Sequence, residues 1–174
     1  MDITQQNVTV VEPPGTGSAL ITTLAEAVAY YHANLALAHD ITCRGRPVRI
    51  VFERDATHLY SVSVDDWTSI PAHLRVIRTI GRGKQETREF SLERAQLMDR
   101  VLPAISNFTF SIPGTGHKGQ QNRMLHGPAL PSGHHMRVVL RPGPGEAWTC
   151  VSAYRVTSDV WLACRRSKQA KFPP

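Results

Sequence analysis

Histidine, arginine, serine and tyrosine side chains are concentrated in residues 134–166, a stretch that reads HHMRVVLRPGPGEAWTCVSAYRVTSDVWLACRR. It holds three apolar runs rich in β-branched and aromatic residues. Turn signals at residues 142–145 and 157–159 separate these runs. This pattern predicts a three-stranded meander. Adjacent strands of such a sheet can bring several polar side chains to one surface.

These residue types are the ones that metal-independent cleavage of an RNA phosphodiester requires. A base takes the proton of the 2′-hydroxyl, an acid protonates the leaving 5′-oxygen, and cations stabilise the charge on the phosphorane. Histidine titrates near neutrality, and arginine binds phosphate with a permanent charge. Side chains alternate along a strand, so Ser152 and Tyr154 share one face, and His135 and Arg137 share a face of the preceding strand. The register between the two strands is left open.

Two further residues outside this stretch join the candidates. His58 follows a predicted strand and lies beside an aromatic residue, so it is the second proton-transfer candidate after His134 or His135. Arg94 falls inside the apolar arc of a predicted helix, so it must either form an internal ion pair or reach a polar site. The candidate catalytic residues are His58, Arg94, His134, His135, Arg137, Ser152 and Tyr154. The candidate substrate-binding residues are His117, Lys118, Arg123, Arg141 and Arg165.

The remaining chain supplies the elements that must position these residues. Helices are predicted over residues 18–39, 70–80 and 92–106, with Ser18 and Ser91 as N-caps of the first and the last. A β-hairpin is predicted from residues 41–43 and 48–52, and a strand from residues 108–112. Residues 81–90 and 113–133 read as loops, and a loop as long as the second is usually functional or mobile.

The order of these elements predicts an α+β fold, in which N-terminal helices pack on a C-terminal antiparallel four-stranded meander. A chain of 174 residues is long enough for one domain with a real core. We expect that domain over residues 18–167. Residues 1–17 are expected to form a flexible tail, and residues 168–174 a basic, frayed tail.

The charge balance favours a polyanionic partner. The chain has 20 lysines and arginines against 14 acidic residues, and its sequence pI is about 9.7. Nucleic acid is the first candidate, ahead of an acidic membrane surface. No apolar run is long enough to span a bilayer and no signal peptide is visible, which predicts no membrane association and action in the cytoplasm. Secretion, or delivery into a target cell by another route, stays open.

Other chemistries find less support in the sequence. The three cysteines, Cys43, Cys150 and Cys164, have no CxxC spacing and are expected to be free thiols. No HExxH or His/Cys/Cys spacing occurs, and adjacent histidines on a strand point to opposite faces, so we expect no metal. No GxSxG elbow indicates a serine hydrolase. We expect no cofactor either.

Several segments resemble the barnase–EndoU–colicin–RelE (BECR) superfamily of phage and bacterial nuclease toxins. Their order is YYHANL, VRIVF, THLYS, ERAQLMDRVLPAI and TCVSAYRV. The family-like features are the His58-Leu59 pair, the helix with Glu93, Arg94 and Arg100, and the run Ser152-Ala153-Tyr154. The resemblance covers residues 18–167 and implies helices followed by a four-stranded meander. The chain departs from the family in its histidine-containing loop 113–133, and no toxin-delivery domain is obvious.

Three functional hypotheses follow. The first is a metal-independent endoribonuclease of toxin or effector type that cuts RNA, with tRNA as one candidate target. An acidic immunity or antitoxin protein would be its natural partner. The second is a non-catalytic module that binds nucleic acid or an acidic protein through its basic sheet. The third and weakest is a toxin resembling ADP-ribosyltransferases.

Overall fold

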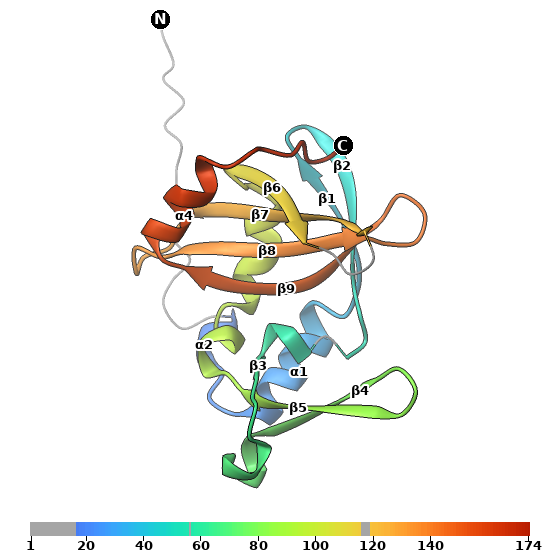
Figure 1. Cartoon of the computed structure of the whole chain (residues 1–174), viewed down its shortest axis with the longest axis vertical. Helices are drawn as coiled ribbons and strands as arrows, with labels where there is room; N and C mark the ends of the chain where they lie inside the picture. The colour runs from blue at the N-terminus through green and yellow to red at the C-terminus, as the bar shows by residue number, and fades with distance from the viewer. Residues whose placement is uncertain (1–16, 56, 116–118) are drawn as a thin grey trace, which may run out of the picture.

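The fold is dominated by β-strands. The computed structural model describes residues 17–55, 57–115 and 119–174. Strands account for 40% of this structure and helices for 30%. The strands form a curled six-stranded sheet and a separate three-stranded sheet (Figure 1). The predicted α+β fold is therefore wrong.

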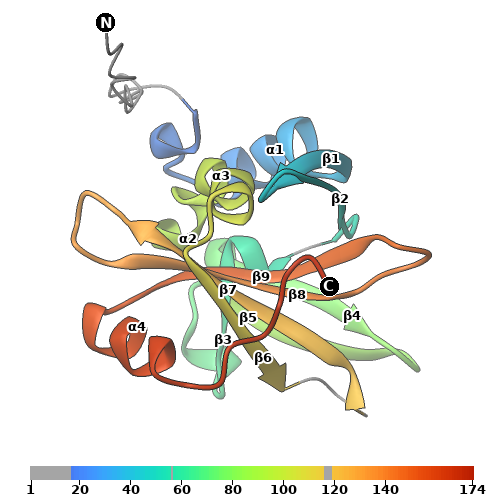
Figure 2. The same ribbon diagram turned by 90° about the horizontal axis from the view of Figure 1, so that it is seen from above.

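The large sheet is mixed, with the strand order β1-β2-β9-β8-β7-β6. Its β1–β2 hairpin joins the rest through a short parallel pairing of β2 with β9, and β9, β8, β7 and β6 are successive antiparallel neighbours. Figure 2 shows how strongly this sheet twists. Its strands are β1 (Leu37–Cys43), β2 (Arg46–Phe52), β6 (Phe110–Thr115), β7 (Gln121–Ala129), β8 (His135–Pro142) and β9 (Trp148–Val156).

The small sheet has the strand order β3-β5-β4 and is antiparallel throughout. Its strands are β3 (Ser61–Ser63), β4 (Arg75–Ile80) and β5 (Lys84–Phe90). A short turn between β4 and β5 contains Arg82 and Gly83, which have positive φ angles of 64° and 70°. Such angles suit a hairpin turn, because they match the twist of the two strands.

Helices are distributed along the described chain instead of being gathered before the strands. The α-helices are α1 (Leu24–Asn34), α2 (Leu92–Ala95), α3 (Val101–Ser106) and α4 (Ser158–Arg165). The 3-10 helices are η1 (Gly17–Leu20), η2 (Thr57–Leu59), η3 (Trp67–Ser69), η4 (Ala72–Leu74) and η5 (Met98–Arg100). In the part of the chain described here, no helix is both long and apolar enough to cross a membrane.

Two hydrophobic clusters cover opposite faces of β6–β9. The larger one joins Leu125, Val138 and Leu140 of the sheet to residues of α1 and α3. The smaller one lies under α4 and consists of Phe110, Ile112, Val156 and Trp161, with Met124, Tyr154 and Cys164 packed against it. The strand alternation that fills both clusters leaves Arg137 and Arg141 half-buried on the α4 side of β8.

The predicted third strand of the meander is helix α4. The segment 157–159 was interpreted as a turn, but Thr157 is an N-cap whose hydroxyl accepts a hydrogen bond from the N–H of Val160 at 3.4 Å. Asp159 lies in the first helical turn, where a negative charge is favourable. Trp161 is buried against Phe110, with ring centroids 5.1 Å apart. The predicted meander is therefore correct for β8 and β9 only.

Other elements were only partly predicted. The hairpin expected from residues 41–43 and 48–52 is confirmed as β1 and β2. The helix expected over 92–106 is broken into α2, η5 and α3. The helix expected over 18–39 is shorter, because Thr23 and Glu26 form a capping box before α1, and His39 lies in β1. Ser18 is not the N-cap of α1; it is buried, and its hydroxyl donates to the Gln96 carbonyl at 2.9 Å.

Two predicted loops and one predicted helix are wrong. Most of the helix expected over 70–80 is strand β4, whose sequence RVIRTI has the β-branched residues that favour strands. The loops expected over 81–90 and 113–133 contain β5 and β7. Apart from Gly17, the expected tail 1–17 lies outside the described residues. The expected fraying of 168–174 is wrong, because Phe172 is buried against Phe108 and Trp148.

The cap of α4 gives a first testable prediction. Thr157→Ala removes the side-chain acceptor at the start of α4 and should lower the free energy of unfolding by about 1 kcal/mol. Thr157→Ser keeps an acceptor and should stay close to the wild-type value. Urea unfolding followed by circular dichroism measures both. Equal stability of the alanine variant and the wild type would argue against this helix.

Candidate functional site

Four aromatic or cationic side chains form one row across strands β6 to β9. The register places Phe110 opposite His126, His126 opposite Arg137, and Arg137 opposite Tyr154. The rings of Phe110 and His126 stack at 4.5 Å. Arg137 donates from Nε to His126 Nε2 at 3.0 Å and from Nη1 to the Tyr154 hydroxyl at 3.3 Å. The row therefore ends in a guanidinium held against a phenol.

A second arginine approaches the same phenol from α2. The Arg94 guanidinium carbon lies 5.2 Å from the centroid of the Tyr154 ring, and that of Arg137 lies 5.7 Å from it. Arg94 also donates to the backbone carbonyls of His58 and Ser61, at 3.0 and 3.2 Å. Both arginines therefore adjoin Tyr154, although they come from different parts of the fold.

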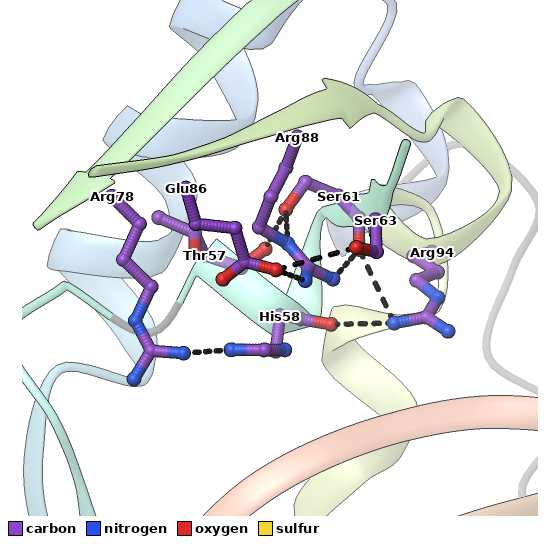
Figure 3. Close-up of polar contacts among 8 residues, drawn as sticks. All are labelled: Thr57, His58, Ser61, Ser63, Arg78, Glu86, Arg88 and Arg94. Atoms are coloured by element: carbon purple, nitrogen blue, oxygen red, sulfur yellow. Dashed lines mark hydrogen bonds and ion pairs between the residues drawn. The ribbon is translucent and has the colours of Figure 1, made fainter. Parts of the chain in front are cut away.

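The short helix η2 carries His58 into this region, and a buried arginine holds it there. Arg88 is only 4% exposed, and it donates to the hydroxyl and the carbonyl of Ser61, at 2.8 and 3.0 Å. The Ser61 hydroxyl in turn donates to the carbonyl of Thr57 at 2.6 Å. Figure 3 shows this network above His58, whose ring faces Arg78. The Arg88 network thus fixes the position of His58.

An acidic residue links Arg78 to the large sheet. One carboxylate oxygen of Glu53 lies 3.7 Å from Arg78 Nη2, and the other accepts a hydrogen bond from Arg141 Nη2. Arg141 is on the same face of β8 as Arg137. We call Arg78, Arg94, Arg137 and Arg141 the arginine cluster. Its contacts connect β4, α2 and β8 around His58 and Tyr154.

Both histidines that touch the cluster are held neutral at pH 7. Burial, followed by the charges of Arg88 and Arg78, lowers the pKa of His58 from 6.5 to about 4. Burial and then Arg137 lower the pKa of His126, also to about 4. Because His126 Nε2 accepts from Arg137, its proton is on Nδ1. Arginines that contact neutral histidines keep their full charge for a ligand.

The cluster is only partly compensated by acidic residues. Within the described residues, Glu53 pairs with Arg78 and Arg141, and Glu86 pairs with Arg88 at 3.0 Å. Arg94 and Arg137 take part in none of the ion pairs found in that part of the chain. Burial is the main cause that lowers the pKa of Arg94. A half-buried pair of cations without a carboxylate is suited to an anionic ligand.

The structure connects four of the seven expected catalytic residues by contacts and places a fifth on the same face of β9. His58, Arg94, Arg137 and Tyr154 are connected by contacts, and Ser152 lies on the same face of β9, opposite Val139. The internal ion pair considered for Arg94 is not formed with any described residue. Of the expected substrate-binding residues, Arg141 joins the cluster.

The other candidates are not joined to the cluster by contacts, although His135 is on the same face of β8 as Arg137. His135 stacks on Trp161 at 4.5 Å, under α4, and His134 follows the turn before β8. Arg123 holds the C-terminal segment, because its Nε donates to the carbonyl of Lys171 at 3.3 Å. Arg165 lies over the Trp161 ring at 5.2 Å. His117 and Lys118 are outside the described residues.

Three residues of the site were not predicted. The sequence predicts a helix at Arg78 and a loop at His126, and it indicates no role for Glu53 at the end of a strand. The β-branched residues of the sequence RVIRTI were a usable signal for a strand at Arg78. For Glu53 and His126 no local signal exists, because their partners are distant in the sequence.

The comparisons with known proteins leave this site without a precedent: no family model, no curated protein and no solved structure matches the chain. The resemblance to the BECR superfamily therefore stays a prediction. In the described ranges, no three His, Cys, Asp or Glu side chains are grouped so that they could hold a metal ion.

The depressed histidine pKa values predict how stability depends on pH. A histidine with a folded pKa of about 4 and an unfolded pKa of 6.5 takes up its proton first in the unfolded state. Its contribution to the free energy of unfolding is complete above pH 6.5 and is lost as the pH falls toward 4. Between pH 7 and pH 5 we expect a loss of about 1–2 kcal/mol for each histidine.

His126→Gln tests this expectation. Glutamine can still accept from Arg137 but does not titrate, so the variant should lose about 1–2 kcal/mol less than the wild type between pH 7 and pH 5. Urea unfolding at several pH values gives the slope of the unfolding free energy against pH for the wild type and for the variant. Comparing these slopes is independent of any loss of packing in the variant. Identical slopes would contradict the low pKa of His126.

Proposed function

We propose that the protein binds the phosphodiester backbone of RNA at the arginine cluster and cleaves it without a metal ion. The observation that supports this most directly is the pair Arg94 and Arg137, half-buried beside Tyr154 and without a carboxylate partner among the described residues. Arginine N–H groups stabilise the charge that develops on a phosphorane. The basic balance of the chain is consistent with such a ligand.

His58 is the proposed general base. It is neutral at pH 7, and its Nε2 accepts from Arg78, which leaves a lone pair for a proton once substrate displaces that contact. A pKa near 4 makes the free imidazole a weak base. A bound phosphate beside Arg78 and Arg94 offsets the charges that contribute to this depression, so substrate binding raises the basicity of His58.

Tyr154 is the proposed general acid. Arg137 donates to the phenol oxygen, which leaves the O–H free to donate to a ligand. The 2′-oxygen attacks phosphorus as its proton passes to His58, and the P–O5′ bond breaks as Tyr154 protonates the leaving oxygen. The products are a 2′,3′-cyclic phosphate and a 5′-hydroxyl. Exchange of one proton through solvent then restores the imidazole and the phenol.

A second candidate function has one observation in its favour. His58 and His126 each contact an arginine through the nitrogen that would act as a base. With these nitrogens occupied, the same residues would form a site that binds an anion such as RNA without cutting it. An acidic immunity protein would meet the same cations under either function.

Cleavage of labelled RNA in the presence of EDTA tests the proposal. The wild type should produce 2′,3′-cyclic phosphate ends, whereas Tyr154→Phe and His58→Gln should each be slower by roughly a hundredfold or more. Tyr154→Phe keeps the ring against both arginines, so circular dichroism should show an unchanged fold. The rates are measured in single-turnover experiments, which report the chemical step.

The matched control is Arg49→Gln. Arg49 pairs with Asp40 on the exposed β1–β2 hairpin, so this variant loses a positive charge away from the cluster. It should cleave at a rate close to that of the wild type. Salt-sensitive binding of RNA without any product would support the non-catalytic function and exclude the enzyme.

A further inference from the structure

Glu53 is placed between two arginines that come from different sheets. It directly follows β2, and its two carboxylate oxygens face Arg78 of β4 and Arg141 of β8. The exposed fractions of the three side chains are 39% for Glu53, 24% for Arg78 and 37% for Arg141. The carboxylate therefore occupies a position that solvent and ligands can reach.

The backbone of Glu53 is fixed even though its side chain is accessible. Its carbonyl oxygen accepts a hydrogen bond from the phenol of Tyr31, a fully buried residue of α1. The preceding residue, Phe52, belongs to the main hydrophobic cluster. Rotation of the side chain alone can thus remove the carboxylate from the arginines without disturbing the fold.

Ion pairs as exposed as this one contribute little to stability. Two arginines that share one carboxylate can also bind phosphate oxygens with the same N–H groups. We propose that Glu53 is an internal stand-in for a backbone phosphate, and that a nucleic-acid ligand displaces it from Arg78 and Arg141. This inference rests on the proposed function and adds a second phosphate subsite to it.

The positions on β8 then define the substrate class. Arg137 and Arg141 are four residues apart on one face, which corresponds to roughly 13 Å along a strand. The two guanidinium groups also have different partners, His126 and Tyr154 for Arg137 and Glu53 for Arg141, so they mark two separate positions for phosphate. The ligand is therefore an oligonucleotide chain with one phosphate at Arg94 and Arg137 and another at Arg78 and Arg141, not a mononucleotide.

A non-cleavable ligand tests this subsite. Glu53→Gln should tighten the binding of a fluorescent 2′-deoxyhexanucleotide by roughly threefold to tenfold at low salt, because a competing negative charge is removed. Fluorescence anisotropy measures the affinity. The binding of a nucleoside 3′-phosphate should change much less, because it lacks a second phosphate.

Two further variants separate this effect from a general change of charge. Asp40→Asn removes an exposed, ion-paired carboxylate from the β1–β2 hairpin and should leave the affinity unchanged. Arg141→Gln should weaken the binding of the hexanucleotide and should also abolish most of the effect of Glu53→Gln. Circular dichroism confirms that each variant is folded.

The outcomes are distinguishable from those of the cleavage experiment, because a 2′-deoxy chain cannot undergo 2′-hydroxyl attack. Tightening by Glu53→Gln alone supports the subsite even if RNA is never cut. The inference is overturned if Glu53→Gln leaves the affinity equal or weaker, if Asp40→Asn has the same effect, or if the mononucleotide gains as much. The inference is also overturned if neither the wild type nor any of the variants binds the hexanucleotide.

Discussion

Arg94 and Arg137 form no ion pair with a described residue, and their charge is the constraint on which the rest of the site depends. Among the described residues, no carboxylate accepts a hydrogen bond from these two side chains: the acceptors are backbone carbonyls for Arg94, and His126, Tyr154 and Cys164 for Arg137. Hydrogen bonds to neutral acceptors satisfy the N–H groups but leave the charge in place. The positive potential beside Tyr154 is therefore built into the fold.

The fold must bring several distant segments together to hold this charge. The register of β7, β8 and β9 places His126, Arg137 and Tyr154 side by side, and α4 adds Cys164, whose sulfur accepts from Arg137 at 3.1 Å. On the other side, Arg88 and Ser61 fix η2, whose carbonyl at His58 receives Arg94. Each arginine is thus positioned by contacts that do not involve the other.

The sequence was informative where the partners are neighbours along the chain. Strong strand patterns on both sides of the turn at 142–145 correctly predicted the β8–β9 hairpin, and alternation correctly put Ser152 and Tyr154 on one face. The segment 157–159 was ambiguous, because threonine, serine and aspartate favour both turns and helix N-caps. Arg78, Glu53 and His126 could not be found by local patterns, because their roles come from contacts between separate sheets or strands.

The distribution of acidic partners among the four arginines is not the one that stability alone would favour. A buried charge gains most from a carboxylate, whereas an exposed ion pair contributes about 0–1 kcal/mol. Here Arg78 and Arg141 share Glu53, whereas the equally half-buried Arg94 and Arg137 beside Tyr154 form no ion pair with a described residue. A carboxylate near Tyr154 would stabilise the free protein but would compete with any anionic ligand. The observed arrangement leaves both guanidinium groups without a competing ion pair among the described residues, as the proposed function requires.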